Sequence, residues 1–526
     1  MNLCDAIFKQ TVTGRTALLY EQRQISYAEL LDQTLGVARA LAALGVGRGD
    51  RVVLLLNDSP EFIAAFIAIS SYGAIAVPIN MALRAEEQYA ILNDCSPSVA
   101  IVEEDIADLL RSETNLPGQL REVVIVDRGR TRSTTETQSK RRGHRDRFLV
   151  DLMATSQPAP TFPTPDVNQP AFILYTSGST GEPKGAVHRQ ADIFYTNDTY
   201  CREVLRLKET DRLFSSSRLP FAYGLGNSFT FPLLNGCVSI LCRAKPTPEV
   251  IAKVFANYKP TVFFGVPVVY RLLLDELKKH RDAQPLDSSA LRLCISAGEA
   301  LPAQLSEDWE KAFGVPVLDG IGSTEMLHMW MSNHEGDVVH GSSGKLLQGY
   351  EAKLLDPEGN PAPVGAEGNL WVKGASAAIG YWQRPEITAN TFVDGWVRTG
   401  DLYRQNADGY WFHMGRSDDC FKSSGQWVSP VEVEGVLLHH TGVNRVAVVE
   451  DFDSDRLPCP CAFVVRSEAA LDSDDLETRL RELARASLPR FKQPRRYLFV
   501  DELPYTATGK VQRFKLREQL RALSIR

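Results

Sequence analysis

Residues 51–79 read RVVLLLNDSPEFIAAFIAISSYGAIAVPI and alternate two kinds of segment. The opening run, RVVLLLN, is apolar and rich in branched side chains, as in a buried strand. The next segment begins with an Asp/Ser cap, has Pro60 in its first turn and stops at Gly73, so it predicts a helix. AIAVPI then predicts a second strand. A strand, a helix and a strand in this order indicate a parallel sheet that helices cover on both faces.

The same alternation continues along the chain. SVAIV and EVVIV are strand-like, and TVFFG, YRLLLDELKKH, LRLCIS and VPVLDG repeat the pattern. The prediction is an α/β fold with doubly wound parallel sheets in a large N-terminal domain. After Arg416 come PVEVEGVLLHH, NRVAVVE, CAFVVR, DDLETRLRELARASL and RRYLFV, which predict a small α+β domain. Residues 1–415 and 416–526 are therefore expected to be two domains, since 526 residues are too many for one hydrophobic core.

The composition argues against several classes of protein. Hydrophobic residues make up 44% and charged residues 23% of the chain, as in soluble globular proteins. The net charge of −7 disfavours a nucleic-acid-binding protein. Nine cysteines without a CxxC pair indicate free thiols of a reducing compartment rather than a zinc site. Residues 128–147 carry eight Lys or Arg against two acids and predict a flexible surface loop.

The most membrane-like segment is the apolar run at 62–79. It is interrupted by Ser70, Gly73 and Pro78, so a buried helix followed by a buried strand explains it better than a membrane span. The N-terminus shows no apolar run typical of a signal peptide. We therefore expect a cytoplasmic location.

The segment LYTSGSTGEPKGAVH, residues 174–188, places hydroxyls, glycines and Lys184 directly after a strand-like run. Glycine permits positive φ and close approach, so hydroxyls and backbone N–H groups can converge on phosphate oxygens. The lysine adds a positive charge. The segment lacks the GxxxxGK[ST] pattern of a P-loop, so by itself it fits either phosphate binding or a surface loop.

Four further turns carry charged side chains suited to a nucleotide. In DGIGSTE, Glu325 can hold Mg²⁺ through one carboxylate while phosphates fill the other positions. In WVRTGDLY, Asp401 follows a Thr-Gly turn and can accept two ribose hydroxyls. GRSDDCFKSSG supplies Arg416 and Asp418, and LPYTATGKVQR presents Lys510. Each of these, taken alone, also fits an ordinary turn.

Taken together, the motifs resemble one family. YTSGSTGEPKG, SAGEAL, DGIGSTE, RTGDLY, GRSDDCFKSSG and TATGK occur in the order found in the acyl-adenylate-forming superfamily of acyl-CoA synthetases, adenylation domains and luciferase. More narrowly, FAYGLGNSFTFPL (221–233) and DGIGSTEMLHMW (319–330) resemble the benzoate-CoA ligase branch, which includes aminobenzoate (anthranilate)-CoA ligases.

The resemblance implies a role for each motif. Lys510 would bridge the substrate carboxylate and the α-phosphate, Thr324 would lie near that phosphate, and Glu325 would bind Mg²⁺. Asp418 matches the hinge of a mobile C-terminal domain, and Gly425 matches the tunnel for the CoA thiol. The residues implied in ATP or AMP binding are Thr176, Ser177, Gly178, Ser179, Thr180, Gly181, Lys184, Gly298, Glu299, Ala300, Asp319, Gly320, Ile321, Thr324, Asp401 and Arg416. One departure is Ile321, where many members carry an aromatic residue that stacks on adenine.

The aryl-acid pocket is expected where small residues adjoin aromatic ones, because this combination makes a flat slot for a ring. Tyr223 can pack edge-on against such a ring. An ortho amino or hydroxyl group would need a polar partner, for which His328, Tyr223 and Ser323 are candidates. The choice among benzoate, 2-aminobenzoate and hydroxybenzoates stays open. The expected pocket residues are Phe221, Ala222, Tyr223, Gly298, Gly320, Gly322, Leu327 and His328.

The implied reaction uses ATP, Mg²⁺ and coenzyme A. An aromatic carboxylate attacks the α-phosphate of ATP, pyrophosphate leaves, and the CoA thiol then attacks the acyl-adenylate and releases AMP. No cysteine nucleophile is required. The alternatives are transfer to a carrier-protein phosphopantetheine, a non-catalytic nucleotide sensor, and oxidative chemistry on the same adenylate. The expected partners are small molecules rather than nucleic acid, and the protein is expected to be a monomer or a homodimer.

Overall fold

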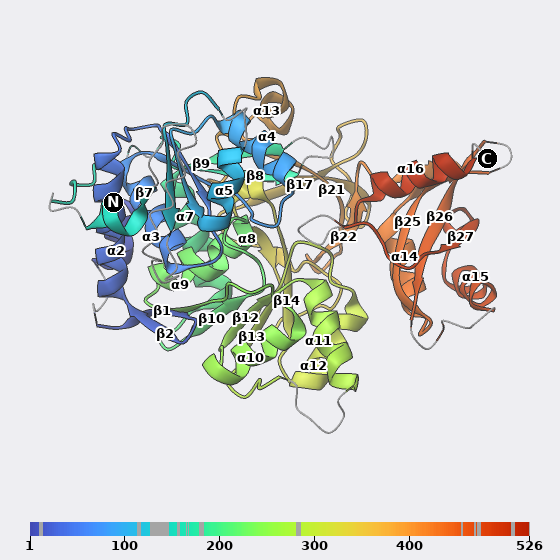
Figure 1. Cartoon of the computed structure of the whole chain (residues 1–526). Coiled ribbons are helices and arrows are strands. Elements are labelled where there is room, and N and C mark those ends of the chain that lie inside the picture. Colours follow the sequence, from blue (N-terminus) through green and yellow to red (C-terminus); the bar gives the residue numbers. More distant parts are fainter. Residues whose placement is uncertain are drawn as a thin grey trace.

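The computed structural model describes residues 1–526 with gaps at 10–13, 113–116, 127–146, 155–157, 165, 167, 178–182, 280–285, 425, 454–455, 468–469, 471–474, 506–510 and 525–526. Two large mixed sheets and a smaller antiparallel sheet make up the part before residue 417, and a three-stranded sheet follows near the C-terminus (Figure 1). Most of the basic segment 128–147 lies outside the described residues.

The predicted strand–helix–strand unit at 51–79 is confirmed and lies in an eight-stranded sheet of order β19-β9-β8-β4-β3-β5-β6-β7. Its strands are β3 (Arg51–Leu55), β4 (Ile75–Pro78), β5 (Val99–Glu103), β6 (Glu122–Val126), β7 (Arg147–Phe148), β8 (Phe172–Ser177), β9 (Pro183–His188) and β19 (Gly380–Tyr381). The pairs from β8 to β7 are parallel, whereas β9 pairs antiparallel with both β8 and β19. The parallel sheet therefore has an antiparallel edge.

The helix of this unit is α3 (Pro60–Tyr72). Ser59 caps its first turn by accepting a hydrogen bond from the N–H of Phe62, and Gly73 ends it in the left-handed conformation with φ 93°. Phe66 packs on Phe172 of β8 at 5.4 Å and on Phe229 at 5.3 Å between ring centroids. The apolar run at 62–79 is thus core helix and strand, and no helix in the described part of the chain has the length and apolar character for crossing a membrane.

The second large sheet has nine strands in the order β16-β15-β14-β13-β12-β10-β11-β1-β2. The strands are β1 (Thr16–Tyr20), β2 (Arg23–Ser26), β10 (Arg212–Ser215), β11 (Val238–Leu241), β12 (Val262–Gly265), β13 (Leu293–Ser296), β14 (Val317–Gly322), β15 (Met329–Ser332) and β16 (Lys345–Leu346). The pairs from β1 to β14 are parallel. At one end β2 pairs antiparallel with β1, and at the other β15 pairs antiparallel with both β14 and β16. The carboxyl ends of the parallel strands meet at one edge, which is the usual place for a ligand in such sheets.

The third sheet was not predicted, and it is wholly antiparallel. Its strands are β17 (Glu351–Leu355), β18 (Glu367–Lys373), β20 (Phe392–Val393), β21 (Trp396–Gln405) and β22 (Trp411–Arg416). WVRTGDLY, which we expected to form a turn at Thr-Gly, lies inside the long strand β21. Gly400 sits mid-strand with φ 75°, a conformation that glycine adopts without strain.

Helices cover these sheets (Figure 1). The described α-helices before residue 417, besides α3, are α1 (Leu3–Phe8), α2 (Tyr27–Ala43), α4 (Ala85–Cys95), α5 (Glu104–Ser112), α6 (Leu149–Met153), α7 (Gln190–Thr196), α8 (Ala222–Leu225), α9 (Phe231–Leu234), α10 (Pro248–Tyr258), α11 (Pro267–Lys279), α12 (Ala303–Phe313) and α13 (Pro385–Thr391). The π-helices η1 (Asn197–Leu205) and η2 (Gly226–Thr230) continue α7 and α8.

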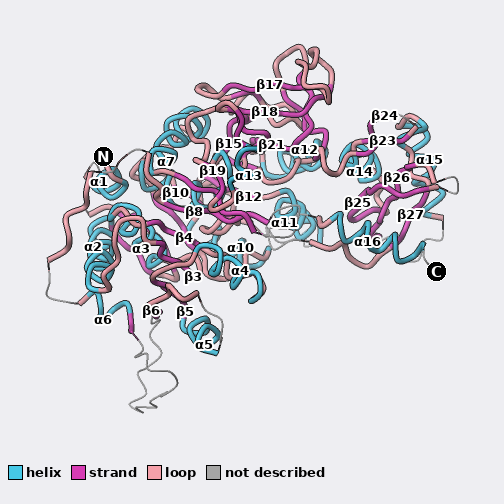
Figure 2. The backbone as a smooth tube through the Cα atoms, turned by 90° about the horizontal axis from the view of Figure 1, so that it is seen from above, coloured by secondary structure: helices cyan, strands magenta, loops and turns pink. Residues whose placement is uncertain are grey.

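The C-terminal α+β segment has the five predicted elements and adds a hairpin, a short helix and a last helix that were not predicted. A short hairpin, β23 (Phe421–Ser423) and β24 (Gln426–Val428), leads into α14 (Pro430–Leu438), β25 (Val443–Phe452), β26 (Pro458–Arg466), α15 (Leu476–Ser487), the short helix η5 (Arg490–Lys492), β27 (Arg496–Phe499) and α16 (Arg513–Ser524). Of these, α14, β25, β26, α15 and β27 were predicted. Both views show this C-terminal unit to one side of the large sheets (Figures 1 and 2), and Figure 1 shows it beyond β22. The boundary at residue 416 remains a prediction.

Candidate active site

The segment LYTSGSTGEPKGAVH forms a hairpin. Thr176 at the end of β8 pairs with Lys184 near the start of β9, so both are strand residues and not members of a long loop as expected. The predicted phosphate-binding residues Gly178, Ser179, Thr180 and Gly181 lie outside the described residues, and of Ser177 only the backbone is described. Within β8, the Tyr175 hydroxyl donates to the Asp94 carboxylate at 2.6 Å, and Arg384 forms an ion pair with the same carboxylate at 2.8 Å.

Glu325 lies in a short 3-10 helix, η3 (Thr324–Met326), just beyond β14. One of its carboxylate oxygens, Oε1, accepts a hydrogen bond from the Tyr381 hydroxyl at 2.7 Å. Its backbone carbonyl accepts from the N–H of Ala378 at 2.8 Å. DGIGSTE was expected to be a turn throughout, but its first four residues are strand, and only the end turns. Tyr381, which lies more than 50 residues later in the sequence, therefore holds the Glu325 carboxylate in place.

The neighbour of Glu325, Thr324, contacts the hairpin of β8 and β9. Its carbonyl lies 2.7 Å from Nε2 of His188, the last residue of β9. The other ring nitrogen of His188 lies 3.0 Å from the carboxylate of Asp192, and both side chains are fully buried. Sequence reasoning missed Tyr381, His188 and Asp192. The available signal was a histidine followed four residues later by an acid, although the contact joins the end of β9 to the first turn of α7.

The predicted adenine contacts lie at the carboxyl ends of β13 and β14. Gly298 has φ 91°, a left-handed conformation that favours glycine. Asp319 of β14 is buried, and this burial raises the pKa of its carboxyl well above the usual value. Glu299 and Ala300 follow Gly298 in the same connection, before α12. Ile321 pairs with Met331 of β15 and packs in an apolar cluster with Trp330 and Leu318, so its role at this point is also structural.

The predicted ribose contacts are adjacent. Asp401 of β21 pairs in register with Arg416 of β22, and the guanidinium lies 3.2 Å from the Asp401 carboxylate. Nε2 of His413 lies 3.6 Å from the same carboxylate oxygen. Arg416 also approaches Asp418, the predicted hinge residue, at 3.7 Å. The structure therefore brings Asp401, Arg416 and Asp418 together, while Gly425 and Lys510 lie outside the described residues.

His328 is the centre of the expected aryl region. It lies three residues after Glu325 and is surrounded by rings, with centroid distances of 4.8 Å to Tyr200, 4.7 Å to Phe231 and 5.7 Å to Tyr223. Its Nε2 lies 3.2 Å from the side-chain oxygen of Asn227. Burial lowers the pKa of His328 to about 3, so the imidazole is neutral at physiological pH. Tyr200, Phe231 and Asn227 were not predicted.

Glycines make room for this histidine. A Cβ on Gly226 would lie 2.6 Å from the His328 ring, and one on Gly322 would lie 2.7 Å from its backbone, closer than real contacts allow. Ala222 lies in the same region, in α8, while Leu327 adopts φ 66° at the turn into β15. The remaining predicted pocket residues are Phe221, which precedes α8, and Gly320, which is packed against Met329 and Met331.

The hydroxyl of Tyr223 is hydrogen-bonded to the backbone. It donates toward the carbonyls of Gly265 and Ile295, each at 3.3 Å. The ends of β12 and β13 therefore orient the Tyr223 ring. Tyr223 lines the expected aryl region, but its hydroxyl is less available to a substituent of the substrate than expected. By contrast, the buried Tyr200 hydroxyl has no hydrogen-bond partner among the described residues.

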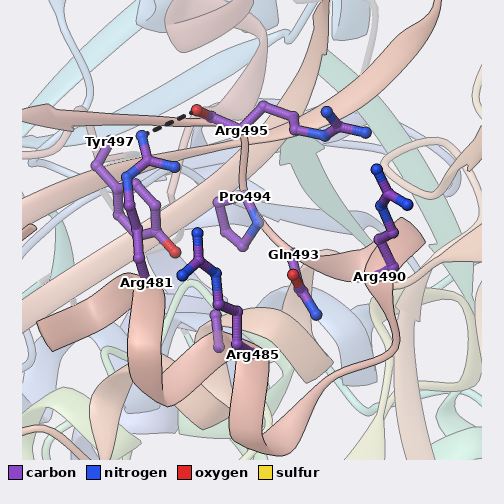
Figure 3. A pocket seen from close by; sticks show the side chains of 8 residues that line it. Arg481, Arg485, Arg490, Gln493, Pro494, Arg495 and Tyr497 are labelled. Carbon is purple, nitrogen blue, oxygen red and sulfur yellow. Dashed lines mark hydrogen bonds between the residues drawn. The ribbon is translucent and has the colours of Figure 1, made fainter. Parts of the chain in front are cut away.

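A separate open pocket of about 450 Å³ lies in the C-terminal unit, between α15 and the start of β27 (Figure 3). Arg481, Arg485, Arg490 and Arg495 surround it, and Arg481 donates to the Arg495 carbonyl at 3.1 Å (Figure 3). Its charge suits an anionic group. None of the predicted site residues lines it.

A resident metal site built from protein ligands alone is not present in the described part of the chain, where no group of three or more His, Cys, Asp or Glu could hold a metal ion. Glu325 fits a different arrangement, in which one carboxylate and the phosphates of a nucleotide share the cation. The cysteines are free thiols, as expected.

Comparisons with known proteins agree with these motifs. The AMP-binding enzyme family matches residues 6–382, and the AMP-binding enzyme C-terminal domain matches residues 432–510. Benzoate–CoA ligase of Thauera aromatica is 38% identical over 510 residues, which cover 96% of this chain and 92% of that protein. The solved anthranilate CoA ligase AuaEII, in complex with anthranoyl-AMP, has a TM-score of 0.92 and 35% identity, covering 100% of this chain and 98% of that one.

A benzoate CoA ligase structure from Burkholderia xenovorans LB400 is similar as well, with a TM-score of 0.86 and 34% identity over 98% of this chain and all of that one. The order of the motifs, the fold and the matched residues lead to one conclusion: this chain belongs to the AMP-binding enzyme family.

Proposed function

We propose that this protein is an ATP-dependent aryl-CoA ligase. It activates a benzoate-type acid as the acyl-adenylate with release of pyrophosphate, and then forms the CoA thioester with release of AMP. The observation that carries the proposal is the segment from Thr324 to His328. Within five residues it joins a carboxylate fixed beside the phosphate hairpin to a neutral histidine enclosed by aromatic rings.

The polar end of this segment supports the first step. A carboxylate is a poor acyl donor because oxide would have to leave, so the acid must first attack the α-phosphate of ATP. Glu325 would hold Mg²⁺ and Lys184 would face the phosphates. When bound, Mg²⁺ would neutralise phosphate charge. Lys510 would contribute a positive charge at the reacting carboxylate and α-phosphate, an effect typically worth a few kcal/mol. Asp401 and Arg416 would hold the ribose, and Asp319 would lie at the adenine.

The apolar end supports an aromatic acid. Rings and small residues share this region, and His328 is uncharged, so it does not oppose the burial of a planar ring. Of the three partners expected for an ortho substituent, Tyr223 is engaged elsewhere. His328 and Ser323 remain, and the substrate stays among benzoate, 2-aminobenzoate and hydroxybenzoates.

In the second step, the CoA thiol must reach the acyl-adenylate from the side that Lys510 would occupy in the first step. We propose that the C-terminal unit turns about Asp418 and brings the Gly425 segment to the adenylate, as hinge residues permit. The pairing of Asp418 with Arg416 is one that this turn would alter. Transfer to a carrier-protein phosphopantetheine remains the alternative to CoA.

The test is a screen of pyrophosphate release over benzoate, 2-aminobenzoate, hydroxybenzoates, octanoate and propionate, with and without CoA. Mass spectrometry identifies the product. We expect an aryl-CoA thioester and a dependence on added Mg²⁺. Pyrophosphate release without any thioester in the presence of CoA, together with loading of a phosphopantetheinyl carrier protein, would favour the alternative.

A further inference from the structure

Tyr381 connects the two sides of the phosphate region. It is the second residue of β19, which pairs antiparallel with β9 so that Tyr381 lies opposite Ala186. Its hydroxyl donates to Glu325 at 2.7 Å, and Lys184 Nζ lies 5.9 Å from the centre of its ring. The metal-binding carboxylate and the phosphate-facing lysine of the proposed site therefore contact the same side chain.

Backbone hydrogen bonds fix the segment around Tyr381 to both Glu325 and β9. The N–H of Ala378 donates to the Glu325 carbonyl at 2.8 Å, and the N–H of Trp382 donates to the Gly185 carbonyl at 2.7 Å. The N–H of Tyr381 itself donates to the Thr388 hydroxyl at 2.9 Å, and its ring packs edge-on against Phe392 at 5.6 Å. The phenol thus has a defined position relative to both the η3 turn and β9.

The chemistry of the phenol suits this position. An ionised carboxylate offers about four lone-pair sites, so one hydrogen bond from a neutral donor restricts its rotation and leaves sites for a cation. A lysine in this place would compete with the cation, whereas a phenol does not. The ring face also attracts an ammonium group.

We propose that Tyr381 is a positioning residue for Mg²⁺·ATP: its hydroxyl orients the Glu325 carboxylate toward the cation, and its ring holds Lys184 toward the phosphates. The proposal rests on the proposed function of the site as an ATP site. It predicts that the two parts of one side chain have separable effects. The hydroxyl should matter for the cation, and the ring should matter for the nucleotide.

Calorimetric titration of ATP, without acid or CoA, over a series of Mg²⁺ concentrations separates these effects. Tyr381→Phe should raise the Mg²⁺ concentration for half-maximal ATP binding by roughly tenfold, the size expected for one hydrogen bond to a charged group, and leave metal-free ATP binding unchanged. Tyr381→Leu should weaken metal-free binding as well. Tyr410→Phe, which removes a hydroxyl bonded to Asp337 away from the predicted site residues, is the matched control and should change neither quantity.

A double-mutant cycle makes the test specific. In the Glu325→Gln background, Tyr381→Phe should produce no further change in Mg²⁺ dependence. An unchanged Mg²⁺ dependence in Tyr381→Phe, or an equal weakening of binding with and without the metal, would overturn the assignment. If wild-type protein binds Mg²⁺·ATP as described but forms no acyl-CoA with any acid, the proposed function fails while the role of Tyr381 stands.

Discussion

Glu325 and His328 are three residues apart, yet their surroundings follow opposite principles. Glu325 is held by directional contacts: a hydroxyl on its carboxylate, an N–H on its carbonyl, and a histidine on the carbonyl of its neighbour. His328 has one polar contact, with the side-chain oxygen of Asn227, and is otherwise held by the packing of three rings and by glycines that leave room for it. A reaction at a phosphate needs hydrogen-bond donors and charges at fixed positions. Binding an aromatic ring needs mainly a pocket of matching shape.

This contrast separates activity from selectivity. Damage to the polar side should slow activation of every acid alike, and damage to the aromatic side should change which acid is preferred. Four substitutions can break or sharpen this comparison.

Lys510→Ala should have the largest effect. We expect adenylate formation to fall by about 10³-fold or more, as when a charged group that acts at the transition state is removed. Thioester formation from supplied acyl-adenylate and CoA should be largely retained, because the role proposed for Lys510 is confined to the first step. Pyrophosphate release and thioester formation are measured separately. Equal loss of both steps would remove Lys510 from its assigned role.

Glu325→Gln should come next, with a loss of about 10²–10³-fold in adenylation, because the neutral amide binds Mg²⁺ weakly. The ratio of kcat/KM for benzoate to that for propionate should not change, since the proposed site for the substrate ring lies at the His328 end of the segment. A marked change in that ratio would show that the two sides are not independent.

Ala222→Leu should act on selectivity. Added methyl groups in the ring slot cause overpacking of about 1–3 kcal/mol. We expect aryl acids to lose about tenfold or more in kcat/KM while acetate and propionate lose less. In the wild type, benzoate or an ortho-substituted benzoate should exceed octanoate by at least roughly tenfold, and an octanoate value equal to the best aryl acid would contradict the aryl assignment.

The last prediction concerns stability and not activity. The pKa of folded His328 is lowered to about 3, so below its unfolded value of 6.5 the unfolded chain binds the extra proton. The stability contributed by the neutral ring is therefore present above about pH 6.5 and is lost as the pH falls toward 3, by at most about 1.4 kcal/mol per pH unit. Chemical denaturation of His328→Gln between these pH values should show a shallower loss than wild type. Parallel curves would mean that His328 is not buried in neutral form.

The sequence predicted the elements better than their contacts. The cap at Ser59 and the stop at Gly73 locate α3, because local signals determine helix ends. The Thr176–Lys184 segment was predicted to be a loop because its glycines are typical of loops, although its last two residues begin strand β9. The antiparallel third sheet was missed, since β21 contains a glycine at positive φ and resembles a turn.

The site was predictable only in part for a similar reason. Motif residues such as Asp401 and Arg416 are adjacent in the structure because two neighbouring strands carry them. The contact of Tyr381 with Glu325 joins residues 56 apart in the chain, and that of His188 with Thr324 joins residues 136 apart. No periodicity in the sequence encodes such pairings, so they emerge only from the folded chain.

The first hairpin of the chain has a consequence for biosynthesis. β1 pairs in parallel with β11, so Leu18 lies opposite Ser239. On the ribosome, the apolar residues of β1 emerge more than 200 residues before the strand that covers them, as this register shows. Parallel pairing over such a separation is slow, and exposed edges invite aggregation. Chaperone demand during synthesis should therefore concentrate on this hairpin, and release of nascent chains stalled before residue 238 should yield protein in which β1 is paired with β2 alone.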